Sequence, residues 1–190
     1  MHAYVISAAL VALAEIGDRT QLLTLMLASR FRQPWAILGG IFLATVANHL
    51  LAAIAGFYIS NVLTAVWFKY AVSLSFIAMA IWALVPDKPR KHKHGSLNLG
   101  VLLTSAVAFF VVEIGDKTQL ATMALAARFH DVFLVAAGST TGMMIANAPA
   151  VFLGEAVTRI IPVKKLRIGA ALIYLGLGLW GIASTAGRVG

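Results

Sequence analysis

The 190-residue chain is 61% hydrophobic and 12% charged, contains no cysteine and carries a formal net charge of +8. This low charged fraction, with apolar runs of about 20 residues throughout, excludes an ordinary water-soluble domain. The absence of cysteine excludes disulfides and thiolate metal sites. The excess Lys and Arg lies in short loops, which is typical of membrane orientation and not of nucleic-acid binding.

Six apolar segments follow one another along the chain, each long enough to cross a bilayer as a helix. One strongly polar stretch, residues 86–97, separates the third segment from the fourth, and its prolines and basic residues indicate a loop. We predict an all-α polytopic membrane protein of six transmembrane helices, built as two inverted three-helix repeats over residues 1–85 and 98–190. The predicted helices cover residues 3–28, 34–58, 64–85, 98–126, 131–157 and 166–186.

An internal repeat supports this division. The 17 residues from Glu15 to Phe31 recur as Glu113 to Phe129, 98 positions later (113 − 15 = 98), and 12 of the 17 positions are identical. Each copy opens one half, and an odd number of crossings inverts the second half relative to the first. Inverted repeats place the substrate site near the middle of the bilayer, where the halves meet.

Four of the seven acidic residues belong to the two repeated motifs, as Glu15 with Asp18 and Glu113 with Asp116. Three positions apart on a continuous helix, the two acids of each motif would share a face. Ionisable side chains in the middle of a span are costly and usually serve a function. Because carboxylates are preferred ligands of Mg²⁺, Ca²⁺ and Mn²⁺, we predict that these four residues bind a hard divalent cation.

Arg19 and Lys117 follow the acids and leave the two motifs with a net charge of about minus two, which one divalent cation cancels. Protons would occupy the emptied site, which is a physical basis for cation/proton exchange. The alternative is that Arg19 and Lys117 pair with Glu15 and Glu113 four residues away and only hold helices together.

Further polar residues around the motifs are candidates for completing or shaping the site. Gly17 and Gly115 permit either a helix break that frees carbonyl oxygens or close helix packing. Buried amides can serve either the site or a plain interhelical hydrogen bond. The oxygen-bearing candidates are Thr20, Gln21, Asn48, Thr118, Gln119 and Asn147.

Positive residues are retained in the cytoplasm, and their distribution predicts the orientation. The side of the membrane that carries the 86–97 loop collects ten Lys and Arg residues. The other side has only Lys69, Arg128 and Arg188. We therefore expect a cytoplasmic central loop and both termini outside.

At Glu15-Ile-Gly-Asp-Arg-Thr20 and Glu113-Ile-Gly-Asp-Lys-Thr118 the chain resembles the Golgi-type calcium/manganese transporter family, over essentially all 190 residues. The resemblance implies six helices, transport of Mn²⁺ and Ca²⁺ as bound substrates without another cofactor, exchange for protons, and the acids of both motifs as cation ligands. The small size is similar to the bacterial branch, which implies manganese efflux across the inner membrane. The choice of Mn²⁺ over Ca²⁺ rests on this resemblance, because the ligand chemistry fits both.

Other functions remain open at this stage. The acids could bind the ammonium group of an organic solute, or line a passive cation channel that lacks proton coupling. An intramembrane aspartyl protease also needs acids from two helices, but it has no reason for near-identical motifs in two halves. The sequence leaves open whether the protein is a homo-oligomer.

Overall fold

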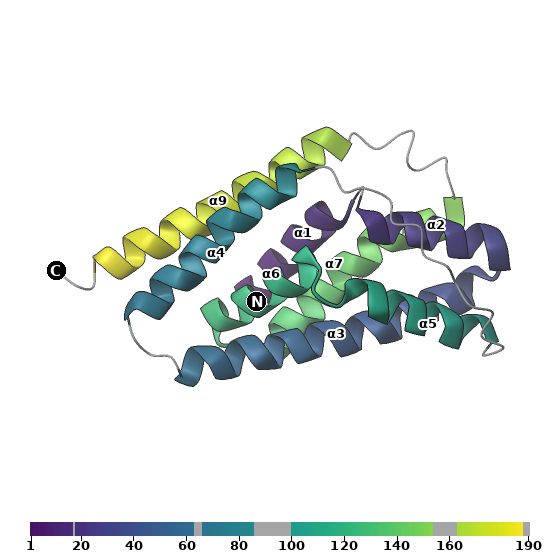
Figure 1. The fold of residues 1–190 in the computed structure, drawn as a ribbon, viewed down its shortest axis with the longest axis horizontal. Coiled ribbons are helices and arrows are strands. Elements are labelled where there is room, and N and C mark those ends of the chain that lie inside the picture. Colours follow the sequence, from purple (N-terminus) through teal and green to yellow (C-terminus); the bar gives the residue numbers. More distant parts are fainter. Residues whose placement is uncertain (17, 63–65, 86–99, 154–162, 188–190) are drawn as a thin grey trace.

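The computed structural model describes residues 1–16, 18–62, 66–85, 100–153 and 163–187, and these residues form eight α-helices. Figure 1 shows an elongated bundle in which α4 and α9 lie side by side. The predicted loop 86–97 and Gly17 lie outside the described residues. The helices are α1 (His2–Glu15), α2 (Arg19–Phe31), α3 (Pro34–Val62), α4 (Val66–Leu84), α5 (Gly100–Glu113), α6 (Lys117–Phe129), α7 (Val132–Leu153) and α9 (Val163–Ala186).

Four of these helices contain stretches long and apolar enough to cross a membrane: Pro34–Ser60, Val66–Leu84, Val132–Leu153 and Ile168–Ala186. The first and fourth predicted segments are not single helices, which corrects the expectation of continuous helices over residues 3–28 and 98–126. α1 and α5 have 14 residues each. A helix of that length extends about 21 Å, less than the roughly 30 Å of a hydrocarbon core.

Both interruptions fall within the repeated acidic motif. Glu15 ends α1 and Asp18 is the N-cap of α2, with extended backbone angles. Asp116 caps α6 in the same way and accepts a hydrogen bond from the Thr118 amide. Asp is a preferred N-cap because its carboxylate accepts from free amides of the first turn. Glu and Asp of each motif therefore lie on either side of a break, and the expectation that they share one helix face is wrong.

Equivalent helices of the two halves make equivalent contacts with the opposite half. α1 packs against α7, and α5, its counterpart in the second half, packs against α3. Gly40 of α3 lies directly against Ser105 of α5, and Gly138 of α7 lies against Ser7 of α1. Both glycines and both serines are separated by 98 positions (138 − 40 and 105 − 7). The repeat seen in the sequence is thus also a repeat of helix contacts.

These glycine contacts should be sensitive to one added methyl group. A Cβ at Gly138 would meet the Tyr4 carbonyl oxygen of α1, which is backbone and cannot move alone. We expect Gly138→Ala to destabilise the protein by about 1–3 kcal/mol, as overpacking usually does. Thermal unfolding in detergent measures the change.

Gly176→Ala is the matched control, because nothing lies within 4 Å of a Cβ at that position. It should leave stability unchanged or slightly higher, since alanine favours helix. Equal melting temperatures for Gly138→Ala and Gly176→Ala would contradict the close approach of α1 and α7.

The third helices of the two halves, α4 and α9, pack against each other. Gly178 and Gly181 of α9 lie against Ser73 of α4, so the two backbones approach closely. Phe76 of α4 and Tyr174 of α9 stack with ring centroids 6.4 Å apart. This pair also obeys the repeat, because 174 − 76 = 98.

Many large apolar side chains lie on the outside of the bundle and the acidic side chains of the two motifs lie inside it, the reverse of what is usual in water-soluble proteins. Large apolar residues such as Leu51, Ile81 and Leu172 are more than half exposed, whereas Glu15, Asp18 and Glu113 are at most 1% exposed. An outer surface rich in apolar side chains suits lipid, and buried charge suits a site inside the bundle. The protein is therefore a multi-pass membrane protein.

Candidate cation site

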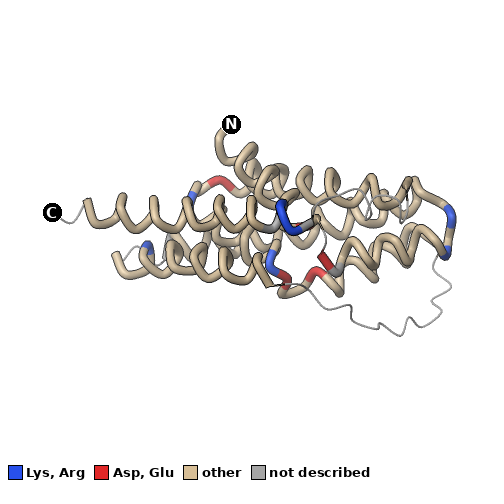
Figure 2. The backbone as a smooth tube through the Cα atoms, turned by 90° about the horizontal axis from the view of Figure 1, so that it is seen from above, with Lys and Arg blue, Asp and Glu red and all other residues tan. Residues whose placement is uncertain are grey.

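The breaks in the two motifs bring carboxylates of both halves together. One carboxylate oxygen each from Glu15, Asp18 and Asp116 lies within 4.8 Å of the others, and all three side chains are buried. Figure 2 shows acidic positions gathered near the middle of the long axis. Glu15 and Asp18 come from the first motif and Asp116 from the second, so the cluster exists only where the halves meet.

Glu113 is buried beside this cluster but is not one of the three mutually close carboxylates. Its Oε2 accepts a 3.3 Å hydrogen bond from Thr118 Oγ1, and its charge acts on Glu15. Of the four predicted acids, the structure therefore brings three within reach of one ion and places the fourth at its edge.

A threonine joins the two acids of each motif across the helix break. Thr20 Oγ1 donates to Glu15 Oε1 and lies 3.3 Å from Asp18 Oδ2. Thr118 Oγ1 makes the equivalent contacts to Glu113 and Asp116, both at 3.3 Å. One hydroxyl hydrogen thus serves two carboxylates in each half, and the threonines fix the acids relative to one another.

Lys117 links the two halves by charge. Its ammonium forms an ion pair with Asp18 Oδ1 of the other motif, and both side chains are buried. This ion pair joins the two motifs, whereas the alternative considered from the sequence paired Lys117 with Glu113 inside one motif. The side chain of Arg19, the equivalent residue in the first half, is outside what the structure describes.

The two glutamines have different partners. Gln21 donates to the Ala146 carbonyl of α7 at 3.2 Å, whereas Gln119 accepts from the Gly115 amide at 2.6 Å. Gly115 itself has a φ of +74°, in the left-handed region that glycine adopts without strain. Gln119 thus stabilises the turn at the break, and Gln21 ties α2 to the second half.

The two asparagines also differ. Asn147 of α7 donates to Glu15 Oε1 at 3.3 Å and accepts from Thr24 Oγ1 at 2.8 Å. Asn48 of α3 donates to the Phe110 carbonyl of α5 at 3.1 Å. Asn147 therefore orients an acid of the cluster, while the described contact of Asn48 joins two helices.

Thr24 is a site residue that the sequence analysis did not single out. It lies one helical turn beyond Thr20 and donates to the Thr20 carbonyl as well as to Asn147. Thr122, 98 positions later, donates to the Thr118 carbonyl at 2.8 Å. Both matching positions of the repeat carry threonine, and this identity in the sequence could have indicated a shared role.

Asn147→Ala should weaken cation binding without unfolding the protein. The change removes the Nδ2 donor from Glu15 and leaves the Thr24 hydroxyl without its acceptor on α7. We expect the KM for the transported cation to rise about tenfold, in line with about 1–2 kcal/mol for a buried hydrogen bond. Initial transport rates at varied cation concentration give the KM. An unchanged KM for Asn147→Ala would show that Glu15 is oriented without α7.

The chemistry of the cluster suits a hard cation. Its oxygens come from carboxylates and hydroxyls, which Mg²⁺, Ca²⁺ and Mn²⁺ prefer. Oε2 of Glu15 is buried, and no hydrogen-bond partner for it is found among the described residues. A buried carboxylate oxygen without a partner is costly, so the site is suited to an ion or a proton that arrives from outside.

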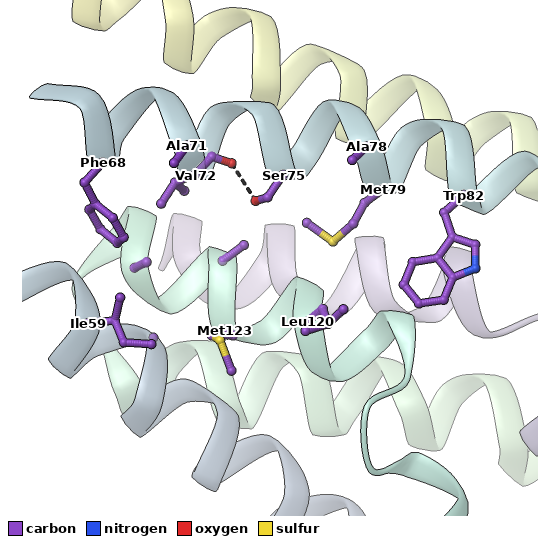
Figure 3. A pocket seen from close by; sticks show the side chains of 13 residues that line it. Ile59, Phe68, Ala71, Val72, Ser75, Ala78, Met79, Trp82, Leu120 and Met123 are labelled. Carbon is purple, nitrogen blue, oxygen red and sulfur yellow. Dashed lines mark hydrogen bonds between the residues drawn. The ribbon is translucent and has the colours of Figure 1, made fainter. Parts of the chain in front are cut away.

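An apolar groove of about 460 Å³ lies between α3, α4 and α6 (Figure 3), and it does not suit an ion. None of its lining residues carries a charge. The hydroxyl of Ser75 is already bonded to the Val72 carbonyl at 2.7 Å. The groove can accept hydrocarbon, and the carboxylate cluster remains the candidate cation site.

The sequence was compared with known proteins and families. Residues 3–91 and 101–188 each match the family described as "Divalent cation/proton antiporter GDT1". The chain belongs to the GDT1 family. The two matches cover the two halves separately, which supports the internal duplication of this chain.

Relatives of the chain cover nearly its whole length. A Vibrio cholerae protein named "Putative manganese exporter" is 44% identical over 94% of this chain and 90% of its own. The Synechocystis protein "GDT1-like protein sll0615" is 30% identical over 87% of this chain and 90% of its own. An Arabidopsis thaliana protein, "GDT1-like protein 5", is 22% identical over 91% and 92%. No solved structure gives a significant match.

Membership of the GDT1 family makes the protein a membrane transporter and not an enzyme. The aspartyl protease considered from the sequence is thereby excluded. Divalent cations and protons are the substrates of the family, which agrees with the carboxylates that the two halves bring together.

Proposed function

We propose that this protein exports Mn²⁺ in exchange for protons, through a site formed by Glu15, Asp18 and Asp116 with Glu113 beside them. The observation that carries the proposal is the approach of carboxylate oxygens from both motifs to within 4.8 Å of one another. A site shared between the halves is suited to opening toward either side when one half moves against the other.

Charge favours a divalent ion and explains the coupling to protons. Four buried carboxylates belong to the two motifs, and the ammonium of Lys117 is paired with one of them, Asp18. The described side chains therefore carry excess negative charge when all are ionised. Like charges at this separation do not all stay ionised in a dry site. A divalent cation or protons can remove the excess, and the two compete for the same oxygens.

The choice of Mn²⁺ is supported by a relative and not by the ligands. Carboxylate and hydroxyl oxygens also suit Ca²⁺, which we propose as a second substrate. The Vibrio cholerae protein that shares 44% identity carries manganese export in its name. We therefore assign Mn²⁺ as the principal substrate.

We further propose six crossings arranged as two inverted three-helix repeats. α3, α4, α7 and α9 would cross as whole helices, while α1 with α2 and α5 with α6 would cross as broken pairs. The matching contacts of Gly40 and Gly138 support two equivalent halves. Broken helices with a site at the break recur in transporters of inverted-repeat design.

Orientation follows from the basic residues. Ten Lys and Arg residues lie on the side of the 86–97 loop, so we place this loop in the cytoplasm and both termini outside. The Vibrio cholerae relative is bacterial, and we place this protein in a bacterial inner membrane with export from the cytoplasm.

Reconstitution in liposomes tests the proposal. Mn²⁺ uptake and internal pH are followed together after an imposed Mn²⁺ gradient. Saturable Mn²⁺ flux with proton movement in the opposite direction is the expected result. Flux without proton movement would point to a channel, and uptake of a cationic amino acid that Mn²⁺ inhibits only weakly would point to an organic substrate.

A further inference from the structure

Tyr174 is a buried polar residue that the cation site as described so far does not use. It lies on α9, is 1% exposed, and belongs to the hydrophobic cluster that contains Leu10 and Ala14 of α1 and Ala121 of α6. Ala14 directly precedes Glu15, and Ala121 lies one turn beyond Thr118. The ring therefore belongs to the apolar cluster that adjoins the two helix breaks.

The Tyr174 hydroxyl has no hydrogen-bond partner among the residues that the structure describes. Buried tyrosine hydroxyls usually have one, and leaving a polar group unpaired is costly. The carboxylates whose charges act on this hydroxyl are Asp116 and Glu15, one from each motif. An unpaired hydroxyl is thus held near two of the three acids that approach each other most closely.

The counterpart of Tyr174 in the first half lacks this hydroxyl. Phe76, 98 positions earlier, stacks on the Tyr174 ring. At the equivalent position of α4, an aromatic ring without a hydroxyl makes the same stacking contact. The oxygen at position 174 is therefore an addition to the repeat, placed where α9 meets the acids.

We propose that the Tyr174 hydroxyl is a further, neutral oxygen group of the cation site, contacting the bound cation or one of its water ligands. It adds an oxygen without adding charge, so it strengthens cation binding and leaves the charge balance with protons unchanged. This inference rests on the proposed cation site but not on proton-coupled transport.

Direct binding tests the inference. Purified protein in detergent is titrated with Mn²⁺, and free Mn²⁺ is measured by its electron paramagnetic resonance signal. We expect Tyr174→Phe to raise the Kd for Mn²⁺ about fivefold, the loss of one modest hydrogen bond or ligand. Tyr58→Phe, which removes an exposed hydroxyl from α3, is the matched control and should leave the Kd unchanged.

Thermal unfolding separates a binding role from a structural one. Because the hydroxyl has no hydrogen-bond partner in the described part of the chain, Tyr174→Phe should melt at the same or a higher temperature than the native protein in the absence of Mn²⁺. Its gain in melting temperature on adding Mn²⁺ should be smaller. An unchanged Kd, or a lower melting temperature with an unchanged response to Mn²⁺, would overturn the inference.

Two combinations of results distinguish a failure of the Tyr174 role from a failure of proton-coupled transport. An unchanged Kd in Tyr174→Phe, with proton-coupled Mn²⁺ flux in the native protein, overturns the role of Tyr174 alone. A raised Kd in a protein that moves Mn²⁺ without protons supports Tyr174 and contradicts antiport.

Discussion

Asp18→Asn and Asp116→Asn should each reduce Mn²⁺ transport at least about 100-fold, since a charge-assisted contact in a buried site contributes about 2–3 kcal/mol or more. The two carboxylates come from different motifs and approach each other with Glu15. An amide keeps the shape of the side chain but supplies only one oxygen and no charge. Because protons and the cation use the same carboxylates, the coupled proton movement should disappear with the Mn²⁺ flux.

The measurement is Mn²⁺ uptake and internal pH in proteoliposomes, with the amount of inserted protein determined for each variant. Asp131→Asn is the matched control, because Asp131 lies outside the cluster and caps α7 through the Leu134 amide at 2.9 Å. Asparagine caps helices about as well as aspartate, so this variant should transport normally. Undiminished flux in Asp18→Asn and Asp116→Asn would identify the cluster as a structural ion-pair group.

Lys117→Gln should bind Mn²⁺ about tenfold more tightly and transport it more slowly. The ammonium of Lys117 is paired with Asp18, so an arriving cation must compete with it. Removing a positive charge close to a cation at a partly screened site changes binding by about 1–2 kcal/mol or more. Tighter binding at an unchanged entry rate means slower release, and the maximal rate should fall with the KM.

The melting temperature of Lys117→Gln gives a second test of the role of Lys117. Without Lys117 and without Mn²⁺, Asp18 is a buried charge that has lost this partner, so Lys117→Gln should melt well below the native protein. Mn²⁺ should restore much of the difference, because a ligand that binds only the folded state stabilises it. Lys117→Arg keeps the charge, as Arg19 does in the first motif, and should behave almost as the native protein. Weaker Mn²⁺ binding in Lys117→Gln would instead assign Lys117 to positioning Asp18.

The sequence predicted the duplicated architecture because repetition is visible without coordinates. The offset of 98 between Glu15 and Glu113 also relates Arg32 to His130, and both of these residues end a helix with a φ of 52°. The all-α class and the membrane setting followed from apolar length alone, since runs of about 20 apolar residues are long enough to cross a bilayer as helices.

The helix breaks were harder to predict, because Glu15 and Asp18 have the spacing of neighbours on a helix. A Gly followed by a capping Asp was the available signal, but the apolar run on both sides favoured one long helix. Contacts between halves were not predictable from one sequence. The pairing of Lys117 with Asp18 and of Asn147 with Glu15 joins residues 99 and 132 positions apart.

On the proposed function, the helix break in the first motif also has a mechanical consequence. Glu15 belongs to the end of α1 and Asp18 to the start of α2, so an ion that contacts both spans a joint between two rigid rods. We expect a loaded site to stiffen this joint and an empty site to leave the short helices freer to rotate. Cation binding and the angle between the short helices would then depend on the same few residues, because the proposed ligands Glu15 and Asp18 stand on either side of the break.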